Sequence, residues 1–438
     1  MTHAHSEIEP GAARPTQKLT RDIVYSIASF GVLAASGLII NVVMTSLRDA
    51  TALGVFNQTY AIYIMASQLA TMGLHYSVLR HSALAEGDAL VRGKVLGTAA
   101  AGALCGGTLA ALVIMAAAGG IAAAFDSPQT GSALRVAAAG LTLFPLNKVL
   151  LAHLNALRHM RAYALLQVTR YSAIMVVVTL LCASKSPTSA TAWAFFAAEA
   201  LTVVAASIYI HVCGEFRNVA VSKEWMCRHC KFGSKALLAG MFAEFNSRID
   251  VMLIGIFLPD REVGIYSFAA MLADGLYNVL AVIRLNVNPI LVRTIRDGNR
   301  AELTDLLTKS KKMLVPAAGV LSVGVLVGFW ALGTYLLPGK GLAEGLPSLV
   351  VLVAALVVVS PMVPFDNLLL VSGHPGYQTL QQLAMVVTNV VVGVALLTVL
   401  GIVGVAVGTA ASYLASAGVL VLNARRQLNW NLITNSFL

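Results

Sequence analysis

The chain has 438 residues, of which 58% are hydrophobic and only 11% are Asp, Glu, Lys or Arg. Its mean hydropathy is +0.79 and its formal net charge is +10. A typical soluble domain carries about 25% charged residues, so this composition excludes an ordinary globular enzyme, a disordered chain and a disulfide-rich secreted domain. It indicates a polytopic helical membrane protein. Because the charges lie in short segments between apolar runs, we expect no nucleic-acid partner.

Windows of about 19 residues predict twelve membrane-spanning helices. The first apolar run starts at Ile23, after a polar tail, and we interpret it as an uncleaved first helix. The predicted helices are 23–45, 52–74, 95–124, 132–153, 162–182, 190–212, 236–258, 263–290, 313–337, 346–371, 379–400 and 402–423.

Lys and Arg concentrate in alternate segments between these helices. The basic segments are the N-terminal tail, 75–94, 158–161, 213–235, 292–312 and the C-terminal tail. The positive-inside rule places these segments in the cytoplasm. We therefore expect both termini to be cytoplasmic.

The chain has the pattern of a duplication. Leu53-Gly54-Val55-Phe56 enters the second predicted helix, and Val263-Gly264-Ile265-Tyr266 enters the eighth, 210 residues later. Six helices separate the two motifs, so both run in the same membrane direction, as in a parallel repeat. The expected units are a tail (1–22), an N-lobe (23–212), a cytoplasmic linker (213–235), a C-lobe (236–423) and a second cytoplasmic tail (424–438). Two such six-helix lobes are expected to enclose a central cavity that opens alternately to each side.

Four predicted helices carry their polar residues on one face: 52–74, 162–182, 263–290 and 379–400. A polar face on a spanning helix is expected to line a wet cavity or to contact protein rather than lipid, and hydrogen bonding between helices is the alternative interpretation. Ionisable residues also lie within the predicted spans. Lys148, Arg284 and Asp366 lie toward cytoplasmic ends, so their side chains can extend to the membrane surface. Glu244 and Arg248 are four residues apart and have the spacing of an ion pair within one helix.

The predicted substrate-cavity residues are Asn57, Tyr60, Gln68, Gln167, Arg170, Arg248, Asp274, Asn278, Arg284, Gln381 and Asn389. The candidates for coupling to a proton or sodium ion are Glu199, Asp250 and Asp274. We expect no other cofactor. Cys227 and Cys230 have the spacing of half a zinc site, but no second pair accompanies them, so no metal site is predicted.

Two segments resemble a known family. Asp250–Gly255 (DVMLIG) and Pro259–Ser267 (PDREVGIYS) resemble the seventh-to-eighth helix signature of bacterial polysaccharide-repeat, or O-antigen, flippases of the Wzx type. These belong to the multidrug/oligosaccharidyl-lipid/polysaccharide exporter superfamily. The segment from Leu53 to Arg80 is similar to the corresponding element of the N-terminal half.

The resemblance implies a flippase that moves an undecaprenyl-diphosphate-linked oligosaccharide from the cytoplasmic to the periplasmic leaflet. It also implies a role in O-antigen or exopolysaccharide synthesis, with a polysaccharide polymerase complex and membrane lipid as partners. Under this interpretation, arginines in the cavity would donate hydrogen bonds to phosphate oxygens. The Asn, Gln and Tyr side chains would form hydrogen bonds with sugar hydroxyls. A cation-coupled multidrug antiporter on the same fold is the alternative. A membrane glycan polymerase or ligase is disfavoured because the predicted outer loops are short, and we expect no catalytic residues.

Overall fold

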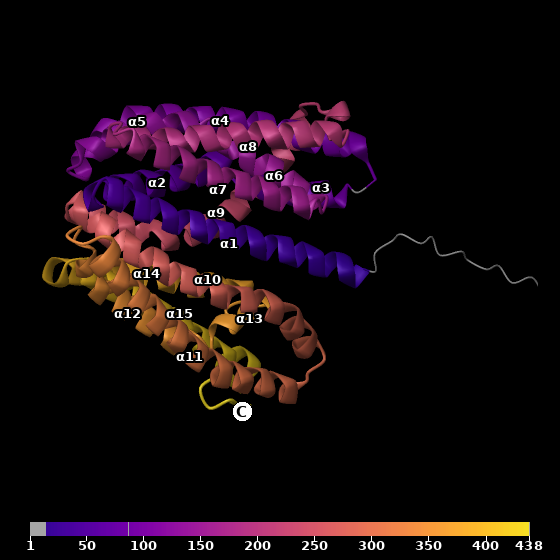
Figure 1. Ribbon diagram of the computed structural model, residues 1–438. Coiled ribbons are helices and arrows are strands. Elements are labelled where there is room, and N and C mark those ends of the chain that lie inside the picture. The colour runs from indigo at the N-terminus through magenta and orange to yellow at the C-terminus, as the bar shows by residue number, and fades with distance from the viewer. Residues whose placement is uncertain (1–14, 86, 438) are drawn as a thin grey trace, which may run out of the picture.

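A computed structural model of the protein describes residues 15–85 and 87–437 (Figure 1). The expected tail, 1–22, lies largely outside the described residues. The helices of the N-terminal half are α1 (Pro15–Leu47), α2 (Ala50–Thr71), α3 (Leu74–Leu84), α4 (Ala89–Ala124), α5 (Pro128–Leu141), α6 (Phe144–Ala156), α7 (Met160–Ala183), η1 (Thr188–Ala192) and α8 (Trp193–Val212).

The C-terminal half is also helical and ends in a short hairpin. Its elements are η2 (Glu215–Asn218), α9 (Lys223–Phe257), α10 (Asp260–Arg296), α11 (Arg300–Ala331), η3 (Leu332–Leu336), η4 (Leu342–Gly345), α12 (Leu346–Val359), η5 (Val363–Phe365), α13 (Leu368–Val371), α14 (Pro375–Leu400), α15 (Ile402–Leu428), β1 (Trp430–Asn431) and β2 (Ser436–Phe437). The prediction of an all-α polytopic membrane protein is confirmed.

Candidate membrane crossings can be counted from the length and composition of the helices. By length and composition, eight helices of the described chain are apolar enough to cross a membrane, or nine if the bent pair α5 and α6 forms one span. Each predicted range overlaps helices of the structure, but the count of twelve spans stays a prediction. Exposed aromatic side chains mark one end of the helices: Trp193, Trp330 and Tyr335. Such residues are typical of a membrane–water interface.

Local sequence explains where several helices begin and end. The Asp49 carboxylate caps α2 by accepting a hydrogen bond from the Ala52 amide at 2.7 Å. Helix α2 ends at Met72 and Gly73, both with positive φ, which separates it from α3. The predicted span 346–371 is interrupted after α12, where Pro361 and Pro364 break the regular hydrogen-bonding pattern.

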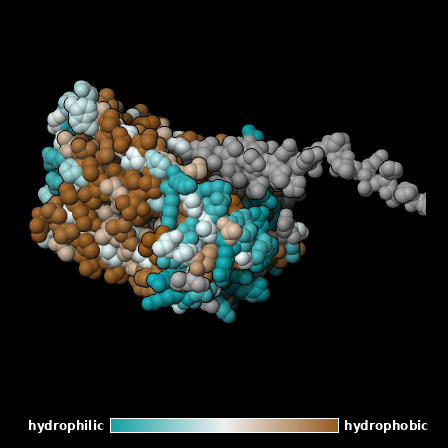
Figure 2. Space-filling view, turned by 90° about the horizontal axis from the view of Figure 1, so that it is seen from below, coloured by the Kyte–Doolittle hydropathy of each residue, from teal (hydrophilic) through white to brown (hydrophobic). Residues whose placement is uncertain are grey.

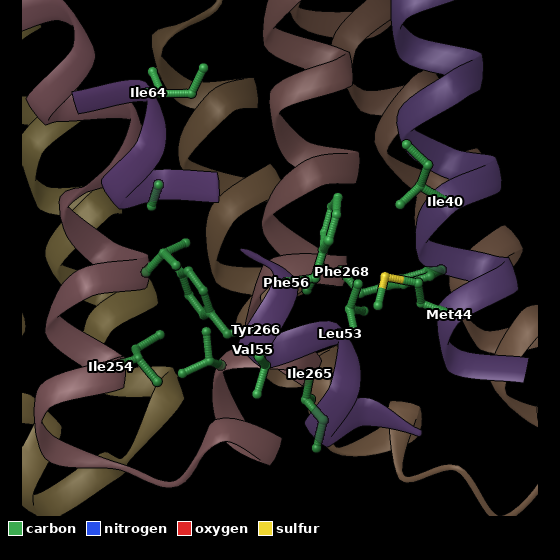
Figure 3. Packing of buried hydrophobic residues seen from close by; sticks show 14 of the residues in the cluster. Ile40, Met44, Leu53, Val55, Phe56, Ile64, Ile254, Ile265, Tyr266 and Phe268 are labelled. Carbon is green, nitrogen blue, oxygen red and sulfur yellow. The ribbon is translucent and has the colours of Figure 1, made fainter. Parts of the chain in front are cut away.

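The largest hydrophobic core of the described chain joins the two halves at one end. The largest cluster joins α1, α2, α5 and α8 with α9, α10, α12 and α15, and Figure 3 shows α2 residues such as Phe56 beside Tyr266 and Phe268 of α10. We call this end the outer end, since it holds the segments predicted to face the periplasm.

At the opposite, inner end each half has its own core. One cluster joins α3, α4, α6 and α8 with Trp225 at the start of α9, and another joins α10, α11, α13 and α15 with Trp430. In Figure 1 the two groups of helices approach each other on the left and diverge to the right, where α1 begins. Figure 2 shows hydrophobic side chains mainly over the left part of the view and hydrophilic side chains gathered from its centre toward the right. The lobes therefore meet at the outer end and separate toward the inner end.

The C-terminal segment, expected to be a simple tail, packs onto the protein. After α15 the chain forms an antiparallel β1–β2 hairpin, with Trp430 opposite Phe437. Trp430 is fully buried, and Lys311 of α11 donates hydrogen bonds of 2.8 Å to the carbonyls of Leu432 and Ile433. The hairpin thus closes the inner end of the C-terminal half.

Candidate substrate site between the two halves

Arg248 of α9 is the central cation of the candidate site. Its guanidinium carbon lies 5.1 Å from the centre of the Tyr60 ring on α2, so this contact joins the two halves of the chain. The Arg248 side chain is partly exposed, and its Nε atom is buried without an acceptor. Within the described chain Arg248 makes no contact ion pair. A guanidinium in this position is available for an anionic ligand.

Helix α10 presents an acidic and an amide group within its predicted span. Asp274 and Asn278 are exposed although they lie within a predicted span. Asp274 interacts electrostatically with Asp250 and Arg248 of α9. Exposure of a carboxylate at this depth fits a hydrated surface, because a carboxylate facing lipid is costly.

The polar face of α2 is divided between two environments. Asn57 and Tyr60 are partly exposed, whereas Ser67 and Gln68 are buried and bound to Lys148 of α6. Lys148 Nζ donates to Ser67 Oγ at 3.1 Å and to Gln68 Oε1 at 2.9 Å. Gln68, predicted as a substrate contact, therefore positions a cation.

Several buried polar atoms without partners lie on helices that carry predicted cavity residues. In the described chain these atoms include Asn57 Nδ2 on α2, Asn246 Oδ1 and Arg248 Nε on α9, Arg284 Nε and Asn288 Oδ1 on α10, and Gln378 Oε1 and both amide atoms of Asn389 on α14. Buried polar groups are normally hydrogen-bonded to protein or water. These faces thus have hydrogen-bonding capacity for water or a polar ligand.

Arg170 and Glu199 are bound to each other inside the N-terminal half. Arg170 Nε donates to Glu199 Oε1 at 2.7 Å, and Asn147 Nδ2 donates to Glu199 Oε2 at 2.6 Å. Glu199 is fully buried, and the Arg170 guanidinium also lies 4.4 Å from the centre of the Phe144 ring. The carboxylate balances the guanidinium charge, which is the condition for burying either group.

The C-terminal half contains a different buried acidic group. Asp250 Oδ2 accepts a hydrogen bond of 2.8 Å from the Tyr266 hydroxyl, which lies 3.3 Å from the Thr409 hydroxyl. Asn389 is buried on α14, which packs against α9 and α15 in this half. Asp250, Tyr266 and Thr409 thus bring together a carboxylate and hydroxyl oxygens, and oxygen ligands are the type that hard cations prefer.

Arg284 is paired rather than free. Its Nη1 donates to Asp366 Oδ2 at 3.0 Å and to the Tyr277 hydroxyl at 3.2 Å. Two predicted glutamines also have protein partners: Gln381 donates to Ser416 at 3.0 Å, and Gln167 donates to Tyr163 at 3.3 Å. The described residues contain no cluster of three or more His, Cys, Asp and Glu side chains suited to a metal.

A polar cluster joins the halves at the outer end. Asp260 of α10 accepts hydrogen bonds from Gln58 Nε2 at 3.0 Å and from Ser127 Oγ at 2.7 Å. Thr130 donates to Gln58 Oε1 at 2.7 Å. The sequence alone does not reveal this cluster, because Gln58 lies off the polar face of α2 and because Ser127 has the pattern of an ordinary helix cap.

The sequence agrees with this architecture. Residues 43–338 match the sequence model of a protein family whose description is "Polysaccharide biosynthesis protein". The chain belongs to this family. No curated protein matches the sequence.

Solved structures share the fold at low sequence identity. An inward-facing multidrug resistance MATE family transporter of the MOP superfamily has a TM-score of 0.78 and 13% identity, covering 92% of this chain and 96% of that one. The lipid II flippase MurJ in an inward closed conformation has a TM-score of 0.74 and 14% identity, covering 92% and 87%. A MATE protein in complex with MaD3S has a TM-score of 0.61 and 14% identity, covering 96% and 98%. This family member therefore has the fold of the MOP superfamily.

Proposed function

We propose that this protein is a flippase that moves an undecaprenyl-diphosphate-linked oligosaccharide from the cytoplasmic to the periplasmic leaflet by alternating access. Its site residues would bind and release this substrate without catalysis. The proposal rests on the environment of Arg248. Among the described residues no carboxylate pairs with its guanidinium, which lies against the Tyr60 ring of the other half. Arginine binds phosphate oxygens through two parallel hydrogen bonds. Membership of a polysaccharide biosynthesis family supports a glycan as the cargo.

The half-exposed polar faces suit the sugar part of such a substrate. Asn57 and Tyr60 on α2 and Asn278 on α10 provide amide and hydroxyl groups to glycan hydroxyls. The separate cores at the inner end leave the halves free to part there, while the shared core holds them together at the outer end. Loading from the cytoplasmic leaflet is consistent with this arrangement. The cytoplasmic position of both termini, the inner-membrane location and a role in O-antigen or exopolysaccharide synthesis belong to the same proposal.

For energy coupling, we infer that Asp250 is a better candidate than Glu199. Glu199 is occupied by Arg170 and Asn147, whereas Asp250 accepts a hydrogen bond from the neutral Tyr266 hydroxyl, which lies beside the Thr409 hydroxyl. A carboxylate without a cation in contact can take up a proton or a sodium ion when the halves move. Asp274, exposed near Arg248, is the second candidate.

Deletion in the native host followed by analysis of lipid-linked intermediates tests the proposal. A flippase predicts that complete repeat units accumulate facing the cytoplasm and that wild-type protein restores export. Arg248→Ala is expected to fail to restore export at normal membrane abundance. Arg228→Ala is the matched control, because Arg228 is exposed on the same helix and pairs with Glu224. Unchanged intermediates together with increased retention of cationic dyes would instead support the multidrug antiporter.

A further inference from the structure

Lys148 of α6 is held against the polar face of α2. Its Nζ donates hydrogen bonds to Ser67 Oγ at 3.1 Å and to Gln68 Oε1 at 2.9 Å, and it lies 4.8 Å from the centre of the Phe144 ring. Lys148 is partly exposed, and the two hydrogen bonds leave one of its three N–H donors for another acceptor. These partners are neutral, so they orient the ammonium group without neutralising its charge.

A second cation lies against the same ring, and it is neutralised. The Arg170 guanidinium carbon lies 4.4 Å from the centre of the Phe144 ring, and Glu199 pairs with Arg170 at 2.6 Å. The other carboxylate oxygen of Glu199 accepts a hydrogen bond from Asn147. In the described part of the chain no carboxylate forms a contact ion pair with Lys148. The cluster thus contains two cations and one carboxylate, and the unbalanced charge is that of Lys148.

The C-terminal half holds a cation at the related position, and there it is paired. Under the 210-residue repeat, Tyr277 of α10 corresponds to Ser67 of α2. Arg284 Nη1 donates to the Tyr277 hydroxyl at 3.2 Å, and Asp366 pairs with Arg284 at 3.0 Å. A charge in a membrane-spanning bundle is expected to have a partner. The environment of Lys148 therefore suits an anionic ligand.

Helix α2 sets the spacing between Lys148 and the other cation of the candidate site, Arg248. Arg248 lies against Tyr60. Lys148 is bound to Ser67, seven residues farther along α2. Seven residues make two helical turns, so the two positions share one face of α2 and are separated by about 10 Å along its axis. Helix α2 runs from the outer end toward α3, which belongs to the core of the inner end. Lys148 therefore lies on the inner side of Arg248, where the halves part.

We propose that Lys148 forms a loading site for the diphosphate headgroup of the substrate, separate from the deeper contact at Arg248. This rests on the proposed function and gives an order to its two cations. A headgroup that enters from the parted inner end meets Lys148 first, and it passes to Arg248 as the inner end closes. A single diphosphate is shorter than the spacing of the two positions on α2. With both side chains held as in the structure, it contacts one cation at a time.

A loading site separates binding from transport. While the inner end is open, the affinity for the headgroup depends on Lys148, because its ammonium group makes charge-assisted hydrogen bonds to phosphate oxygens. Arg248 acts in the later step, when the headgroup moves outward. A variant without Lys148 is therefore expected to fail at binding, and a variant without Arg248 is expected to bind the headgroup and fail to transport it.

Binding of farnesyl diphosphate to the purified full-length protein in detergent tests the loading site. Lys148→Gln is expected to weaken binding about tenfold or more, because the charged donor is lost, and Lys148→Arg should restore most of the affinity. Arg248→Ala should weaken binding much less than Lys148→Gln does. Lys231→Gln is the control, since Lys231 is an exposed lysine of α9. Wild-type affinity in Lys148→Gln, or an equal loss in Lys148→Gln and Arg248→Ala, would overturn the proposal.

Other ligands separate headgroup recognition from a general effect on the structure. Farnesol has the same hydrocarbon chain without a charge, and its binding should not change in Lys148→Gln. An equal loss of farnesol and farnesyl diphosphate binding would contradict the proposal, because the effect would not depend on charge. Inorganic pyrophosphate should displace farnesyl diphosphate, and phosphatidylglycerol should do so only weakly because it carries less charge. Equal displacement by both would make Lys148 a general contact for lipid phosphate and would also overturn the loading site.

Transport in liposomes distinguishes failure of the loading site from failure of the proposed function. Wild-type protein that moves the lipid-linked oligosaccharide, together with wild-type affinity in Lys148→Gln, would overturn the loading site and leave the flippase in place. Folded wild-type protein that neither binds farnesyl diphosphate nor moves the oligosaccharide would contradict both. The expected result is transport by the wild type, and binding without transport by Arg248→Ala.

Discussion

Gly54 of α2 and Gly264 of α10 pack against each other's helix as an almost symmetrical pair. A Cβ atom on Gly54 would lie 1.8 Å from the Asp260 carbonyl oxygen, and one on Gly264 would lie 1.9 Å from the Ala50 carbonyl oxygen. Ala50 and Asp260, like the two glycines, are 210 residues apart. The reciprocal contact is what a two-fold axis between the halves produces. It supports the parallel repeat and locates the axis where the halves meet.

Replacing Gly54 with alanine is therefore expected to force the helices apart at the outer end. The new methyl group meets backbone that cannot rotate away, so we expect a loss of about 1–3 kcal/mol in stability and a lower melting temperature. Gly275→Ala on α10 is the matched control, because its Cβ would meet nothing within 4 Å. Equal melting temperatures for Gly54→Ala and Gly275→Ala would contradict the packing described for this crossing.

Asp260→Ala should weaken the closed outer end. The change leaves the Gln58 amide and the Ser127 hydroxyl without their acceptor, at a cost of about 1–3 kcal/mol for each group that stays buried. Spin labels on exposed Gln129 and Ala343, one on each half, report the separation by pulsed electron paramagnetic resonance. We expect a new population at longer distance in Asp260→Ala. A distance distribution identical to that of the parent protein would show that this cluster does not hold the outer end closed.

Arg170 and Glu199 are expected to act as a structural pair. Glu199→Gln leaves the Arg170 charge buried without its partner and should cost about 3–5 kcal/mol. The double change Arg170→Met with Glu199→Gln should recover much of this loss, as measured by thermal unfolding in detergent. Normal stability of Glu199→Gln with complete loss of transport would instead favour Glu199 as an ion-coupling residue.

His229 predicts a pH dependence of stability outside the membrane spans. It lies on the first turns of α9, between Ser77 and the Val95 carbonyl, and burial lowers its pKa to about 4. The unfolded chain takes up a proton near pH 6.5 and the folded protein does so only near pH 4. This contribution to stability is therefore fully present above pH 6.5 and declines as the pH falls toward 4, by at most about 3 kcal/mol.

Melting temperatures at pH 7.5 and 5.0 test this effect. The decrease on acidification should be smaller in His229→Asn than in the wild type. The same decrease in both proteins would remove His229 as a cause.

Structural features that depend on one helix at a time could be predicted from the sequence. Apolar run length predicted the helices, and the matching motifs at Gly54 and Gly264 predicted the relation between the halves. Arg248 could be predicted as a site residue because a charged side chain deep in a membrane span must be shielded from lipid. Pairing between distant helices was not predictable in the same way: Arg170 and Glu199 were assigned separate roles, and the structure joins them. The sequence places Lys148 toward the cytoplasmic end of its predicted helix. In the structure its Nζ donates hydrogen bonds to Ser67 and Gln68 on the neighbouring helix α2.

The account is tested most directly by transport in reconstituted liposomes. An undecaprenyl-diphosphate-linked oligosaccharide is placed in one leaflet, and its appearance in the other is measured with a soluble glycosidase that cannot cross the membrane. We predict that the wild-type protein makes the glycan accessible and that Arg248→Ala does so at less than about one tenth of that rate. Accessibility no greater than in protein-free liposomes, with the wild-type protein correctly folded, would contradict the flippase account.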